Sequence, residues 1–254
     1  MEKRVSEISR RKVNHPANGE NSTMILGGLQ KTTLIDFPGR LAATVFLCGC
    51  NFRCPWCYSR ELVLPAEIKK QPKVSERDFF NFLEERKGWL EGVVVCGGEP
   101  TIHKELPDFL GKIKNLGYLV KLDTNGSNPA MLKTLIDEKL VDYIAMDVKG
   151  PRERYGEFAG QKVEVKKIQE SIDILRTGRV DYEFRTTWVP RLHTPEDILQ
   201  IAEWIKGAEK YYLQNFRPEK TVDPEFAARK PCSEEYLWQI QRALSSYFKT
   251  VQIR

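Results

Sequence analysis

The chain has 254 residues, 41% of them hydrophobic, which is enough for one large α/β domain with a sizeable core. Its 40 basic and 35 acidic residues give a net charge of +5, and because the two signs are interspersed, we expect no nucleic-acid partner. No apolar run approaches the roughly 18 residues that span a bilayer, and the N-terminus is charged, so we expect a cytoplasmic protein outside the membrane.

Residues 1–22 differ from the rest of the chain, since they are polar, lack hydrophobic periodicity and contain the turn-forming pair Asn18-Gly19. We therefore expect a flexible N-terminal extension there. The folded domain is expected to comprise residues 23–254.

After this extension, short β-branched runs alternate with amphipathic helical patterns. We expect strands at residues 44–47, 92–96, 120–123, 143–147, 182–188 and 211–215, and helices at 75–86, 105–115, 129–138, 165–175, 195–206 and 234–248. This alternation predicts parallel strands with right-handed crossovers. Six units rather than eight predict a partial (β/α)6 TIM-like barrel, with its chemistry at the carboxyl ends of the strands.

The first expected strand runs into three cysteines, Cys50, Cys54 and Cys57, with three and then two residues between them. Three thiolates can hold three irons of a 4Fe–4S cluster, whereas a cluster that only carries electrons normally has four protein ligands. The compact set of three therefore predicts one iron left open for a small molecule. Cys48 leaves a zinc site or a fully ligated cluster as alternatives, although we interpret it as a strand residue.

Two further cysteines and two of the histidines are expected to be structural. Cys96 ends the second expected strand, where a thiol usually behaves as a small buried hydrophobic group, and Cys232 follows a proline in an expected loop. His103 and His193 lie beside turn-forming residues and have no ligand-like neighbours in the sequence.

Polar or glycine residues also follow the second and sixth expected strands. Gly97 and Gly98 allow close backbone approach, and Glu99 supplies a carboxylate that can accept hydrogen bonds from an ammonium group. Gln214 and Asn215 end the sixth strand. The alternative for each is an ordinary turn or strand-end residue.

Charged residues mark the ends of the third, fourth and fifth expected strands. Asp123 with Thr124, and Asp147 with Lys149, are expected at the same edge of the sheet. Two carboxylates facing one site repel each other unless a cation or a hydrogen-bond network stabilises them. Arg185 on an inner strand likewise needs a partner, because burying an unpaired guanidinium is costly. Solvated loop charges remain the alternative.

The cysteine spacing, with Trp56 directly before the third cysteine, resembles the CxxxCxxC motif of the radical S-adenosylmethionine (SAM) enzymes. The resemblance implies that Cys50, Cys54 and Cys57 hold a 4Fe–4S cluster at which SAM binds. Further site residues implied or expected around SAM are Trp56, Gly97, Gly98, Glu99, Asp123, Thr124, Asp147, Lys149, Arg185 and Gln214. The resemblance also implies a monovalent cation held by Asp123, Thr124, Met146 and Asp147.

The opening segment at residues 25–39 resembles that of the anaerobic ribonucleoside-triphosphate reductase activating proteins, a branch of the glycyl-radical-enzyme activases. Membership would imply one electron from reduced flavodoxin or ferredoxin, reductive cleavage of SAM, and a glycyl radical on a partner reductase. The chain departs from the common pattern at Tyr58, where histidine is usual, and at Cys48, where glutamine is frequent.

Two other functions stay open. A related radical SAM enzyme, such as a deazaguanine-forming synthase, would apply the same core to a small molecule. A non-catalytic iron–sulfur electron-transfer protein would use Cys48 as the fourth cluster ligand. For an activase, a partner loop is expected to dock beside residues 125–129.

Overall fold

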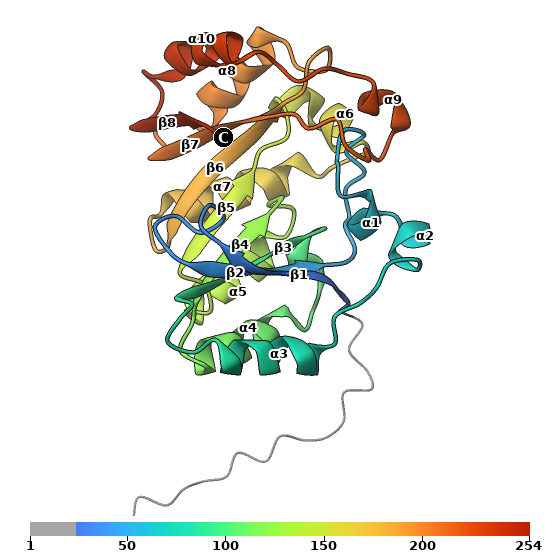
Figure 1. The fold of residues 1–254 in the computed structure, drawn as a ribbon. Coiled ribbons are helices and arrows are strands. Elements are labelled where there is room, and N and C mark those ends of the chain that lie inside the picture. The colour runs from blue at the N-terminus through green and yellow to red at the C-terminus, as the bar shows by residue number, and fades with distance from the viewer. Residues whose placement is uncertain (1–23) are drawn as a thin grey trace, which may run out of the picture.

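The computed structural model describes residues 24–254, so the extension expected at residues 1–22 lies outside the described residues (Figure 1). Eight strands form one sheet in chain order from β1 to β8. They are β1 (Leu26–Thr33), β2 (Ala42–Leu47), β3 (Gly92–Gly97), β4 (Leu119–Thr124), β5 (Tyr143–Asp147), β6 (Asp181–Trp188), β7 (Lys210–Asn215) and β8 (Thr250–Ile253). Only the β1–β2 pairing is antiparallel among these neighbours.

The partial barrel is confirmed, with β2 to β7 at the positions of the six expected strands. The expected count of six is wrong for the described chain, because β1 and β8 extend the sheet at its two edges. Both lack a continuous apolar run: β1 contains Gly27 and Gly28, and β8 has only four residues, none of them fully buried. The two edge strands do not pair with each other, so the barrel stays open.

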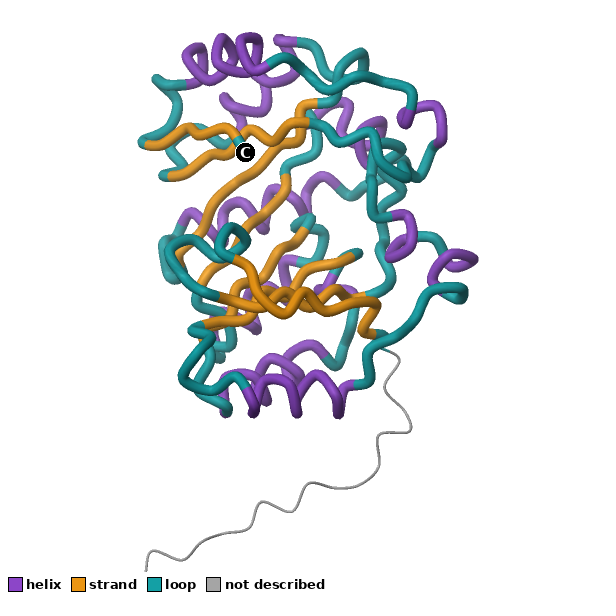
Figure 2. The backbone as a smooth tube through the Cα atoms, in the orientation of Figure 1, coloured by secondary structure: helices purple, strands orange, loops and turns teal. Residues whose placement is uncertain are grey.

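The longer helices lie where the sequence patterns predict them, and they form an arc around the strands (Figure 2). They are α3 (Glu76–Glu85), α4 (Leu106–Asn115), α5 (Pro129–Asp137), α7 (Val165–Arg176), α8 (Pro195–Trp204) and α10 (Glu234–Leu244). Short helices α1 (Arg60–Val63), α2 (Pro65–Ile68), α6 (Tyr155–Ala159) and α9 (Pro224–Ala227) lie in the connecting loops.

Local capping explains where several helices begin. The Ser75 side chain accepts a hydrogen bond from the backbone of α3, and Asn128 caps α5 directly before Pro129. Thr194 and Asp197 form a reciprocal capping box at the start of α8. These caps fix the loops that follow the strands, and those loops carry the candidate site.

The two faces of the sheet are chemically different. Side chains on the outer face, such as Val93, Val95 and Leu122, are fully buried in a large apolar core with the helices. On the inner face, a small apolar cluster around Phe37 and Tyr143 lies towards the amino ends of the strands. Nearer the carboxyl ends the inner face becomes polar, which positions charged groups inside the barrel. Among residues 24–254, no helix is both long and apolar enough to cross a membrane.

Candidate active site

Residues 50–57, termed the cysteine loop, follow β2 and carry the free thiols of Cys50, Cys54 and Cys57. The backbone N–H of Phe52 donates to Cys50 Sγ at 3.3 Å, and that of Cys57 donates to the Cys54 carbonyl at 3.0 Å. The pKa of Cys50 is raised to about 11 and that of Cys54 to about 12, mainly by burial; a neighbouring thiol contributes to each rise, and Lys149 opposes both. The three thiols thus lie near enough to influence one another's pKa, and soft thiolates are the donor set that iron–sulfur clusters take.

Cys48 has different surroundings. Its sulfur accepts a hydrogen bond from Gln71 Nε2 at 3.5 Å and packs so tightly on Gly27 that a Cβ there would lie 2.6 Å away. His103 Nε2 lies 3.0 Å from the Cys48 carbonyl oxygen. Cys48 lies one residue beyond the end of β2, so the expectation of a strand residue is wrong by one position. These contacts give Cys48 and His103 structural partners, and a role for Cys48 outside the cluster stays a prediction.

Hydrogen bonds from two directions hold the cysteine loop in place. Asn51 Nδ2 donates to Ser127 Oγ at 2.8 Å, and Asn125 Nδ2 donates to Asn51 Oδ1 at 2.9 Å, which ties the loop to the end of β4. On another side, the backbone N–H of Val222 donates to the Cys57 carbonyl at 2.9 Å. Sequence analysis missed Asn51 and Val222, although an amide side chain between two cysteines was a readable signal for Asn51.

Gly97 and Gly98 are required by close packing of β3 on β2. Gly97 has φ +126°, and a Cβ on either glycine would overlap backbone atoms of Leu47 or Gly49. The Gly98 N–H donates to the Leu47 carbonyl at 2.8 Å. The glycines thus fix the junction behind the cysteine loop, and backbone approach to SAM stays a prediction.

Glu99 is fully buried and its carboxylate is saturated with hydrogen bonds. It accepts from Thr101 N at 3.0 Å, Thr101 Oγ1, Thr124 Oγ1 at 2.7 Å and Asn125 N at 2.6 Å. Burial raises its pKa, which the hydrogen bonds oppose. Glu99 therefore positions the β3 and β4 loops, and its expected role in binding an ammonium group remains a prediction.

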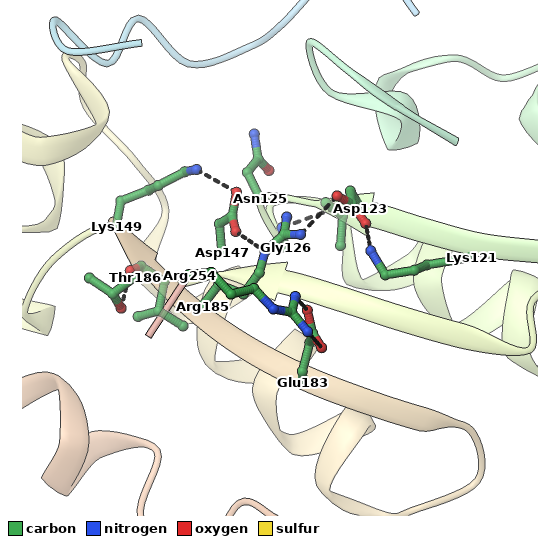
Figure 3. A network of polar contacts seen from close by, with 12 residues as sticks. Lys121, Asp123, Asn125, Gly126, Asp147, Lys149, Glu183, Arg185, Thr186 and Arg254 are labelled. Carbon is green, nitrogen blue, oxygen red and sulfur yellow. Dashed lines mark hydrogen bonds and ion pairs between the residues drawn. The ribbon is translucent and has the colours of Figure 1, made fainter. Parts of the chain in front are cut away.

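Arg185 bridges the two aspartates inside the barrel (Figure 3). Its Nε donates to Asp147 Oδ1 at 2.7 Å and its Nη1 donates to Asp123 Oδ2 at 2.8 Å. Lys121, which is 1% exposed, pairs with the other Asp123 oxygen. Despite burial, the pKa of Asp123 is held below its usual range by Arg185 and Lys121, and that of Asp147 by Arg185 and Lys149. The network is the stabilisation that two adjacent carboxylates require.

This arrangement bears on the expected monovalent-cation site. Thr124 donates to Glu99, and Met146 is fully buried with its side chain packed against Gly126. In the described part of the chain, no three His, Cys, Asp or Glu side chains group closely enough to hold a metal ion. Arg185, Lys121 and Lys149 supply positive charge to the aspartates, and a further cation remains a prediction.

Lys149 connects the aspartates to the cysteine loop. Its Nζ donates to Asp147 Oδ2 at 2.9 Å and lies 5.3 Å from the centre of the Trp56 ring. The pKa of Lys149 is raised, because the Asp147 and Cys54 charges outweigh its burial. Trp56 is buried, and its Nε1 has no hydrogen-bond partner among residues 24–254. Trp56 and Lys149 therefore lie between the thiols and the carboxylates.

At the end of β7, the two neighbouring candidate residues Gln214 and Asn215 have different surroundings. Asn215 exchanges hydrogen bonds of 2.9 and 3.0 Å with the backbone of Cys232, so it anchors a loop. Gln214 is half-buried and shares the inner face with Tyr212, since alternate residues of a strand point the same way. Gln214 thus remains available to a ligand inside the barrel.

Sequence analysis missed a second polar layer beneath this one (Figure 3). Glu183 is fully buried and accepts from Arg254 Nη1 at 2.7 Å and from the Tyr143 hydroxyl at 2.9 Å. Alternating polar residues in β6 are equally compatible with a solvent-facing strand, so the sequence carries no clear sign of this layer. The charge of Glu183 helps to keep the pKa of Arg185 high.

Comparisons with known proteins agree with this geometry. The Radical SAM superfamily model matches residues 44–205. A Methanocaldococcus jannaschii protein named "Putative glycyl-radical enzyme activating enzyme MJ1227" is 34% identical over 236 residues, covering 91% of this chain and 95% of that protein. A 7-carboxy-7-deazaguanine synthase of Thermococcus kodakarensis is 25% identical, with 71% and 76% covered. Escherichia coli QueE shares the fold at a TM-score of 0.52 and 16% identity, with 91% and 93% covered. The chain therefore belongs to the radical SAM superfamily.

Proposed function

We propose that the protein is a glycyl-radical-enzyme activase and that its partner is an anaerobic ribonucleoside-triphosphate reductase. Membership of the radical SAM superfamily implies a 4Fe–4S cluster and SAM. The observation that carries the activase proposal is the 34% identity to the M. jannaschii protein across 95% of its length, whereas the reductase as partner rests on the resemblance of residues 25–39. Reduced flavodoxin or ferredoxin is the proposed electron donor.

In this proposal Cys50, Cys54 and Cys57 would each ligate one iron through a thiolate, and binding of the cluster would release the protons that burial keeps on these thiols when no iron is bound. Bound together, cluster and SAM would supply one chemistry, the reductive cleavage of SAM with one electron from the donor, coupled to removal of an α-hydrogen from a glycine of the partner. The protein contributes orientation, charge and exclusion of water.

The remaining residues would hold SAM on the inner face of the sheet. The Lys149 ammonium, which lies beside Trp56 and the thiols, is suited to a carboxylate. Gln214 lies on the same face, and its side-chain amide, which forms no hydrogen bond within residues 24–254, would face a nucleoside. Arg185 keeps Asp123 and Asp147 at fixed positions between these groups, so that the ligand meets a preorganised site.

The function is tested by anaerobic reconstitution with iron and sulfide, followed by reduction with SAM in the presence of candidate reductases. A glycyl signal in electron paramagnetic resonance (EPR) that requires both proteins supports the proposal. Cys54→Ala should abolish both cluster binding and SAM cleavage, because a buried ligand is lost. Full cleavage by this variant would contradict the ligand assignment.

A deazaguanine-forming activity is the second candidate, favoured by the 25% identity to the T. kodakarensis synthase. It predicts that SAM cleavage is coupled to a small molecule rather than to a protein. Incubation with candidate small molecules, followed by mass spectrometry for 7-carboxy-7-deazaguanine, separates the two candidates. Product formation without any partner protein would favour the synthase.

A further inference from the structure

A connecting segment that follows β7 reaches from the carboxyl edge of the sheet to the cysteine loop. This segment, residues 216–232, is termed the strap. At its end, Cys232 is fixed by the two hydrogen bonds with Asn215. Near its middle, the N–H groups of Val222 and Asp223 donate to the carbonyls of Cys57 and Pro55, both at 2.9 Å. The strap is therefore attached directly to the cysteine loop.

The turn at residues 189–193, which follows β6, faces the strap. Arg229 of the strap donates through Nη1 to the Pro190 carbonyl at 3.1 Å, so the two segments touch. His193 anchors the turn from inside, because its Nδ1 accepts from Val189 N at 3.1 Å and its Nε2 lies 2.9 Å from the Lys149 carbonyl. The turn at residues 189–193 and the strap thus form two walls. The turn is anchored to Lys149, and the strap is anchored to the cysteine loop.

Between these walls lies a pocket of about 590 Å³, termed the basic pocket. Its lining includes Pro190, Arg191, Glu225, Ala228, Arg229 and Lys230. Three cations thus face one carboxylate. Arg191 and Lys230 are exposed and form no ion pair within residues 24–254. Arg191 also has a left-handed backbone, φ +64°, a conformation that costs a non-glycine residue backbone energy.

We propose that the basic pocket binds an acidic segment of the partner polypeptide and so presents that partner to the radical site. Two unpaired cations attract carboxylates. Glu225 would repel a compact polyanion, whereas Pro190 and Ala228 offer apolar surface to an aliphatic side-chain stem. The pocket therefore fits carboxylate side chains on a peptide better than a free phosphate.

The proposal rests on the proposed function, since it concerns the protein substrate of the same site. Its test measures binding without SAM or reductant, so its failure and the failure of radical chemistry are separate results. The probe is a fluorescent peptide of alternating glutamate and glycine, compared with one of alternating glutamine and glycine. Binding to the full chain with its cluster is followed by anisotropy at low salt.

The pocket variant Arg191→Gln/Lys230→Gln should bind the acidic peptide at least about tenfold more weakly than the unaltered protein. The control Lys31→Gln/Lys166→Gln removes the same charge from exposed lysines on β1 and α7, and should change affinity less than about twofold. Lys230→Gln alone should give a smaller loss in the same direction.

Three results would overturn the proposal. The first is an equal loss of affinity for the acidic peptide in the pocket and control variants, which would indicate that binding depends on net charge alone. The second is equal binding of the glutamine peptide. The third is binding of inorganic phosphate, detected by calorimetry, to a pocket that does not bind the acidic peptide.

Discussion

Arg185 shows at the scale of one residue how the barrel tolerates charge in its interior. Its guanidinium is nearly buried and binds two carboxylates through separate nitrogens. Removing one partner of such a group leaves the others buried and uncompensated, which costs far more than breaking an exposed ion pair. The interior of the candidate site therefore depends on a complete set of charges.

Arg185→Gln is expected to lower the free energy of unfolding by about 3 kcal/mol, because Asp123 and Asp147 lose their shared cation. Urea unfolding measures this change. Arg179→Gln is the matched control, since Arg179 pairs with Asp137 at 2.6 Å on the exposed surface and should cost below about 1 kcal/mol. Equal losses in the two variants would mean that the buried bridge contributes no more than a surface pair.

At the scale of elements, the junction of β2 and β3 determines the position of the cysteine loop. Gly98→Ala is expected to reduce iron bound after reconstitution at least severalfold, because the added Cβ would overlap the Gly49 carbonyl beside Cys50. Gly111→Ala in α4 is the control, since its Cβ has 3.9 Å of space and alanine favours helices. Normal iron content in Gly98→Ala would show that the junction does not control the loop.

The β6 turn gives a prediction for pH. His193 is buried between Phe158 and Trp188, and burial lowers its pKa from 6.5 to about 4. As the pH falls through this range, the unfolded chain takes up a proton that the folded chain excludes. The free energy of unfolding should therefore fall, by on the order of 3 kcal/mol between pH 7 and 4.

His193→Gln keeps one donor and one acceptor but cannot titrate, so it should lack this contribution. The quantity to compare is the difference between the unfolding free energies of the two proteins as pH is varied. A difference that stays constant from pH 7 to 4 would show that His193 is not held neutral by the fold.

At the scale of the whole molecule, the strands with apolar runs were predictable, and so was the edge at which polar residues gather. Edge strands β1 and β8 were not, because they are only partly buried and lack that pattern. Sequence indicated Glu99, Asp123, Asp147 and Arg185 as site residues. It could not show that Glu99 and Arg185 bind other side chains, because those contacts join residues distant in the chain.

Cys48 illustrates the same limit. Its spacing alone allows a fourth cluster ligand, whereas its contacts with Gly27 and Gln71 direct the sulfur into structural packing. Three chain thiolates and one open iron are consequently the central feature of the account, because radical chemistry at this edge of the barrel requires SAM to reach the metal.

The most direct test is EPR of the reduced, reconstituted protein before and after addition of SAM, with Cys48→Ala measured alongside. We predict that SAM changes the cluster spectrum in both proteins, since the open iron does not depend on Cys48. A spectrum unaffected by SAM in the unaltered protein, together with loss of the cluster in Cys48→Ala, would contradict it.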